Sequence, residues 1–105
     1  MSYSLDQKYK NKIVAVLAAL FPQAKIILYG SRARMDNQEK SDIDIAIDAG
    51  KELARVDIGE ARDMLNESSI PYKIDVVDYW SVSQAMRDAI IKDGIKLKIC
   101  KEIST

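Results

Sequence analysis

Hydrophobic residues recur along this chain with two different periods, and each period predicts one kind of element. Apolar side chains three and four positions apart predict a helix over residues 7–20, which ends before Pro22. The same spacing predicts two further long helices over residues 51–67 and 81–93. The middle helix is expected to turn five apolar side chains inward: Leu53, Val56, Ala61, Met64 and Leu65.

Short runs rich in β-branched residues separate these helices and predict strands. KIILY at residues 25–29 and YKIDVVDY at residues 72–79 are two such runs. DIDIAID at residues 42–48 keeps isoleucine at every second position, which is the strongest strand pattern in the chain. IKLKIC at residues 95–100 alternates again and predicts an edge strand. Helices and strands that alternate in this way favour the α/β class, with a sheet at the centre.

Two helix starts carry residues that suit capping. Ser31 follows the Gly30 that ends the first strand, and it is expected to cap a short helix that runs through Arg34. Ser81 with Gln84 forms a capping-box pattern at the start of the last helix.

Length and charge limit what the chain can be. Its 105 residues suit a single domain over residues 1–105, with enough length for a real core. Sixteen basic and sixteen acidic residues cancel, so no strong nucleic-acid binding is expected. No apolar run is long enough to cross a bilayer and no secretory signal is present, which predicts a cytoplasmic protein without a membrane partner.

The residue types present restrict the possible chemistry. The chain has no histidine, which excludes Ser-His and Cys-His dyads and an ordinary zinc site. The single cysteine, Cys100, excludes an internal disulfide and suits a reducing compartment. Any metal ion must therefore be held by oxygen atoms, which favours Mg²⁺ or Mn²⁺.

Three aspartates within apolar strands are the candidate metal ligands. Asp42 and Asp44 share one face of their strand, and a divalent cation would relieve their mutual repulsion. Asp75 would join them if its strand is the neighbour of theirs. For the first pair alone, a solvated acidic strand face is an equally good interpretation. Asp48 and Asp78 are expected to serve only in capping or solvation.

Gly30 and Ser31 lie between a buried strand and a helix, where backbone N–H groups and a hydroxyl can face an anion. Arg32 and Arg34 can add charge-assisted bonds to a polyphosphate. An ordinary strand-to-helix turn has the same short pattern, and Arg34 is equally suited to a surface salt bridge.

The stretch GSRARMDNQEKSDIDIAID at residues 30–48 resembles the G-S…D-x-D signature of the polymerase β-like nucleotidyltransferases. GSRAR followed by SDIDIAI is similar in particular to the minimal nucleotidyltransferases, small proteins often encoded beside a helical HEPN-domain partner. KIDVVD falls where that family keeps its third aspartate, whereas Met35 departs from the glycine of many relatives. The resemblance implies the nucleotidyltransferase fold, with helices packed on a small mixed sheet.

The resemblance also implies an activity: transfer of a nucleoside monophosphate, AMP from ATP by preference, to a hydroxyl acceptor, with release of pyrophosphate. It assigns the triphosphate to Gly30, Ser31 and Arg32, and two Mg²⁺ ions to Asp42, Asp44 and Asp75. Asp75 would also assist deprotonation of the acceptor. In the antitoxin version of such systems, the acceptor is a tyrosine of the HEPN partner.

A second interpretation keeps the fold without the chemistry, as an antitoxin or regulatory subunit that neutralises its partner by contact. Three converging carboxylates favour catalysis over simple contact. The chain contains neither GxxxxGK[ST] nor GxGxxG, so P-loop and dinucleotide-binding proteins fit poorly. Trp80 suits either the core or a partner interface.

Overall fold

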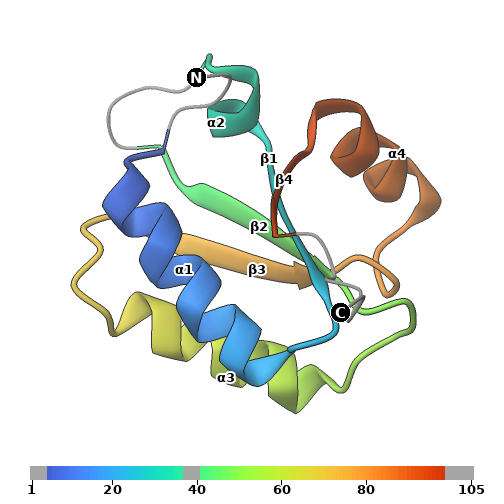
Figure 1. Cartoon of the computed structure of the whole chain (residues 1–105). Coiled ribbons are helices and arrows are strands. Elements are labelled where there is room, and N and C mark those ends of the chain that lie inside the picture. The colour runs from blue at the N-terminus through green and yellow to red at the C-terminus, as the bar shows by residue number, and fades with distance from the viewer. Residues whose placement is uncertain (1–4, 37–40, 99–105) are drawn as a thin grey trace, which may run out of the picture.

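A mixed four-stranded sheet forms the centre of the fold (Figure 1). The computed structural model describes residues 5–36 and 41–98. The strands lie in the order β3-β2-β1-β4 and are β1 (Lys25–Tyr29), β2 (Ile43–Asp48), β3 (Ile74–Asp78) and β4 (Ile95–Lys98). β1 is antiparallel to both of its neighbours, whereas β2 and β3 are parallel. The α/β class and the mixed sheet are therefore confirmed.

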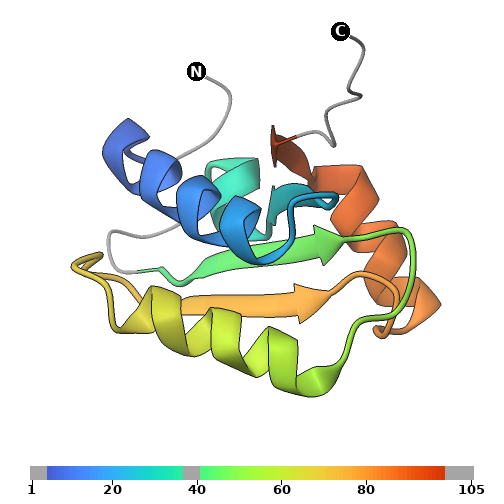
Figure 2. The ribbon, with the colours of Figure 1, turned by 60° about the horizontal axis from the view of Figure 1, so that its bottom comes forward.

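Helices cover both faces of this sheet (Figure 2). α1 (Gln7–Leu20) and α3 (Arg55–Asn66) pack against each other on one face, and α4 (Gln84–Asp93) lies on the other. α2 (Ser31–Arg34) is a single turn directly after β1. β4 confirms the predicted edge strand over its first four residues, and residues 99 and 100 lie outside the described part of the chain.

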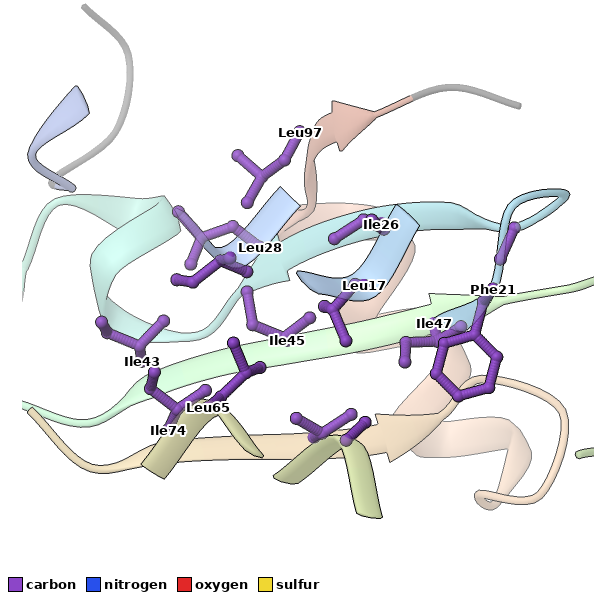
Figure 3. Packing of buried hydrophobic residues seen from close by; sticks show 14 of the residues in the cluster. Leu17, Phe21, Ile26, Leu28, Ile43, Ile45, Ile47, Leu65, Ile74 and Leu97 are labelled. Atoms are coloured by element: carbon purple, nitrogen blue, oxygen red, sulfur yellow. The ribbon is translucent and has the colours of Figure 1, made fainter. Parts of the chain in front are cut away.

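The period-two pattern of β2 divides the core into two layers. Ile43, Ile45 and Ile47 are fully buried on the face that α1 and α3 cover, where they pack with Leu17 and Leu65 (Figure 3). Ala46 faces the opposite way, into a smaller cluster with Ile27, Tyr29 and Ile90. The polar residues of β2 therefore lie on the face that carries α4.

The start of α3 differs from the prediction by four residues. The helix begins at Arg55, and residues 51–54 are a loop instead. The backbone N–H of Leu53 donates to Asp78 Oδ2 at 2.7 Å, and this tertiary bond ties the loop to the end of β3. The hydrophobic pattern does not report such a bond.

Two apolar side chains of α3 lie outside the core, contrary to expectation. Val56 is 75% exposed and Met64 is 43% exposed. The buried stripe of this helix consists of Ile58, Ala61 and Leu65, so the inward face is narrower than predicted.

Neither Ser31 nor Ser81 is the N-cap of its helix, so both capping predictions are wrong. The N-cap of α2 is Gly30, and no side chain caps that helix. α4 begins three residues later than expected because Ser83 is its N-cap, accepting a hydrogen bond from the Met86 N–H at 3.2 Å. Ser81 is held in the preceding turn, where its backbone N–H donates to the Asp78 carbonyl.

The outer edge of β3 is capped by two side chains of α3. Asn66 Oδ1 accepts from the Ile74 N–H at 2.9 Å, and Asn66 Nδ2 donates to the Ile74 carbonyl at 2.8 Å. One turn earlier, Arg62 Nη2 donates to the Val76 carbonyl at 2.9 Å. These bonds satisfy backbone groups that an edge strand otherwise leaves to solvent.

Among residues 5–36 and 41–98, no helix has the length and apolar character needed to span a bilayer.

Candidate active site

Asp44 lies at the centre of the candidate site because both neighbouring strands place a polar residue beside it. Its cross-strand partners are Tyr29 on β1 and Asp75 on β3. Parallel pairing of β2 with β3 therefore meets the condition under which Asp75 was expected to join the other aspartates. Asp42 precedes the first residue of β2 and is exposed.

The three carboxylates interact electrostatically. Burial raises the pKa of Asp44 above its ordinary value, and the negative charges of Asp75 and then Asp42 raise it further. Arg34 opposes this shift by lowering the pKa of Asp44. A cation placed among these carboxylates would relieve their repulsion.

Tyr29 belongs to the same polar surroundings, and the sequence pattern did not identify it. Burial raises the pKa of Tyr29 above its ordinary value, and the charges of Asp44 and Asp75 add to the shift. The hydroxyl therefore stays neutral at physiological pH. KIILY showed only a strand that ends at glycine, so its last side chain carried no separate signal.

Gly30 and Ser31 form the predicted anion-binding turn, called the anion loop below, and Gly30 brings this loop into contact with Asp44. Its φ is +77°, in the region that favours glycine. A Cβ at this position would lie 2.5 Å from Asp44 Oδ2 and 3.3 Å from Asp44 Cγ. Glycine is therefore required here for its backbone conformation and for close approach of the carboxylate. Ser31, the first residue of α2, follows directly and is half-buried.

Arg32 is buried, with only 5% of its surface exposed. Its Nε and Nη2 donate to the Ser41 carbonyl at 3.1 and 2.9 Å. Its guanidinium carbon lies 4.4 Å from the centroid of the Tyr72 ring. Arg32 therefore ties the loop after β1 to the residue that precedes Asp42.

Arg34 takes up the salt-bridge role that the sequence left open. Its Nε lies 3.0 Å from Asp36 Oδ2 and its Nη1 lies 3.2 Å from Asp93 Oδ2. Because the Arg34 side chain is exposed, these contacts contribute little to stability.

Asp75 has a cationic neighbour that the sequence did not indicate. Arg62 Nε lies 3.5 Å from Asp75 Oδ1. Arg62 belongs to α3, whose apolar stripe packs on the opposite face of the sheet, so its side chain passes around the edge of β3. Helical periodicity gives no sign of such a path.

Asp48 and Asp78 have the structural roles expected of them. Asp78 is buried and accepts from the N–H groups of Leu53 and Trp80, at 2.7 and 3.0 Å. Asp48 accepts from the Trp80 indole at 2.6 Å and from the Gly50 N–H at 2.9 Å. Both aspartates therefore hold turns at the far ends of their strands.

The chemical type of these three carboxylates suits a hard cation such as Mg²⁺. Their donors are all oxygen, and their mutual repulsion favours a cation. As the side chains stand, no group of three acidic, histidine or cysteine residues in the described ranges is close enough to hold an ion. Asp42 is exposed and Asp75 contacts Arg62 through Oδ1, so forming the site requires the three carboxylates to move closer together.

Three similarities to known proteins bear on this site. Shewanella oneidensis protein adenylyltransferase MntA is 30% identical over 94 residues, covering 89% of this chain and 67% of the relative. A crystal structure of a toxin–antitoxin with AMP-PNP matches with a TM-score of 0.76 and 30% identity, over 86% of this chain and 73% of that one. A structure of tri-AMPylated Shewanella oneidensis HEPN toxin with MNT antitoxin matches with a TM-score of 0.74 and 28% identity, over 90% and 73%.

The family described as polymerase beta, nucleotidyltransferase matches residues 11–102, which include the anion loop and all three aspartates. This match and the structural similarities confirm the resemblance carried by GSRAR and SDIDIAI, and they confirm the fold that it implied. The chain belongs to the polymerase β nucleotidyltransferase family.

Proposed function

We propose that this protein transfers AMP from ATP to a hydroxyl group of a HEPN-type partner protein. The observation that carries the proposal is the contact of Gly30 with Asp44, together with the pairing of Asp44 and Asp75 across two strands. The relative named protein adenylyltransferase and the structure of an AMPylated HEPN toxin support the donor and the partner class.

The proposed roles follow from position. Gly30 and Ser31 bind the triphosphate through the loop, with α2 too short to add much of a helix dipole. Asp42, Asp44 and Asp75 would hold Mg²⁺ or Mn²⁺, which would neutralise phosphate charge and polarise the reacting oxygens. Arg32 was expected to contact phosphate, but its bonds to Ser41 favour the role of fixing the loop beside Asp42.

The proposed reaction is an in-line displacement at the α-phosphorus of ATP. The acceptor hydroxyl oxygen forms the new P–O bond, the bond to the β-phosphate bridging oxygen breaks, and pyrophosphate leaves with that electron pair. Asp75 accepts the hydroxyl proton, which suits its place on the outer strand with 44% of its side chain exposed. We propose the cytoplasm as the site of action, because the single cysteine, Cys100, suits a reducing compartment.

The test uses the purified chain, its HEPN-type partner, Mg²⁺ and ATP labelled at the α-phosphate. Label is expected to enter the partner, and Asp42→Asn combined with Asp44→Asn is expected to abolish the transfer. Omission of Mg²⁺, or addition of EDTA, is expected to abolish it as well. If the wild-type protein transfers no label to its partner, and the doubly substituted protein still neutralises that partner, the protein acts by contact and the proposal fails.

A further inference from the structure

The side chain of Arg62 makes a contact that capping of the β3 edge does not explain. Its Nη2 donates a hydrogen bond to the Val76 carbonyl at 2.9 Å. Its Nε is buried and has no hydrogen-bond partner within the described ranges, and it lies 3.5 Å from Asp75 Oδ1. An unsatisfied buried donor is unfavourable, so this arrangement calls for a physical reason.

Asn66 shows what edge capping alone looks like. It lies one turn further along α3, where its neutral amide bonds both backbone groups of Ile74 and donates to the Arg62 carbonyl. Arg62 fixes the next part of the same strand but also places a positive charge beside Asp75. The two residues thus share one structural task and differ in their relation to the candidate site.

We infer that Arg62 is a positioning residue for Asp75. Anchored by the Val76 carbonyl, the guanidinium attracts one oxygen of the carboxylate and leaves the other for the acceptor proton and the cation. The same positive charge weakens cation binding at Asp75, so the enzyme gains orientation at the expense of metal affinity. The inference rests on the proposed function, because it gives Asp75 its part in the reaction.

Three variants separate orientation from edge capping. Arg62→Met removes the charge and keeps the chain length, and Arg62→Lys keeps the charge. Asn66→Ala removes the Ile74 cap and the bond from Asn66 Nδ2 to the Arg62 carbonyl, and leaves the Arg62 side chain in place. Each variant is assayed for AMP transfer with kcat and KM for ATP determined separately. Mn²⁺ binding to each nucleotide-free protein is measured by electron paramagnetic resonance, below the unfolding temperature of all variants.

For Arg62→Met we expect kcat to fall about tenfold with KM for ATP nearly unchanged. We expect its Mn²⁺ affinity to rise about threefold, because a nearby positive charge has been removed. Arg62→Lys is expected to restore wild-type Mn²⁺ affinity and part of kcat. Asn66→Ala is expected to leave both quantities near wild type, even if its unfolding temperature falls.

Opposite changes in kcat and Mn²⁺ affinity cannot come from a loosened strand, which would lower both. A wild-type kcat in Arg62→Met, or an Mn²⁺ affinity that falls or equals that of Asn66→Ala, overturns the inference. If the wild-type protein transfers no AMP, the proposed function fails. The Mn²⁺ measurements then still decide whether Arg62 acts on the carboxylate.

Discussion

The α-carbon of Gly30 lies against the carboxylate of Asp44, so closely that a methyl group there would sit 2.5 Å from Oδ2. The absence of a side chain at Gly30 therefore allows the backbone just after β1 to lie against Asp44, the central residue of the candidate site. Because Gly30 of the predicted anion loop contacts Asp44, a shift of either residue would displace the other.

Replacement of Gly30 by alanine should therefore distort the backbone of the anion loop and displace the Asp44 carboxylate. The added methyl group must displace Asp44, and a φ of +77° is strained for any residue other than glycine. We expect kcat/KM for ATP to fall about 100-fold. Steady-state transfer assays measure this change, with the unfolding free energy determined in urea.

Gly50→Ala is the matched control for this substitution. Gly50 has a similar φ of +81°, but a Cβ there would meet nothing within 4 Å. Both variants should lose about 1 to 2 kcal/mol of stability through backbone strain, and only Gly30→Ala should lose activity. Equal activity of the two variants would show that the contact with Asp44 is unimportant.

Asp44 should make stability depend on pH. Its raised pKa means that the folded protein binds the Asp44 proton more tightly than the unfolded chain does. The resulting stabilisation is complete at acidic pH and is lost as the pH rises through the folded-state pKa. At pH 7 ionised Asp44 is therefore unfavourable, and Asp44→Asn should raise the urea midpoint in metal-free buffer.

The advantage of Asp44→Asn should disappear when the pH is brought below the ordinary range of aspartate, where wild-type Asp44 is also neutral. Glu60→Gln provides a control, because Glu60 is exposed on the outside of α3. A urea midpoint of Asp44→Asn that stays below wild type at pH 7 would contradict the unfavourable charge.

Divalent cations should stabilise the wild-type protein. Binding to the folded state alone adds about 1.4 kcal/mol when Mg²⁺ is present at ten times its dissociation constant. Urea unfolding with Mg²⁺ or with EDTA measures this gain, which should be absent from Asp42→Asn combined with Asp44→Asn. Equal gains in both proteins would place the cation elsewhere.

Arg32 should matter more for stability than for direct phosphate binding. Loss of the two part-buried bonds from buried Arg32 to the Ser41 carbonyl should cost Arg32→Met about 2 to 3 kcal/mol. Arg32→Lys should recover little, because an ammonium cannot reproduce the planar pair of donors. Arg34→Ala, which removes only exposed ion pairs, should cost less than about 1 kcal/mol.

Urea unfolding and ATP binding distinguish the two possible roles of Arg32. A variant that keeps wild-type stability but loses ATP affinity would show that Arg32 binds phosphate, as the family resemblance first implied. A loss of stability with ATP affinity retained at low temperature would support the fixing role.

Local pattern predicted most of the fold because most elements here obey their own periodicity. α1 and β1 begin and end where expected, and β2 differs by a single residue. The loop before α3 was mistaken for helix, and a bond from the Leu53 N–H to the distant carboxylate of Asp78 fixes that loop. Tertiary bonds of this kind leave no trace in the residues whose structure they change.

The candidate site divides along the same line. Parity along one strand predicted a shared face for Asp42 and Asp44, and the cost of a carboxylate inside an apolar strand pointed to Asp75. Tyr29 and Arg62 could not be found this way, because their positions depend on which strands pair and on a side chain passing around a sheet edge.

The caps that Asn66 and Arg62 place on β3 also bear on how other molecules can meet this side of the protein. An incoming extended peptide would need the Ile74 amide and carbonyl and the Val76 carbonyl, all already bonded. Sheet extension across the first half of β3 is therefore closed to foreign chains. A partner that docks there must instead recognise side chains on the surface. Point substitutions can change those side chains without disturbing the sheet.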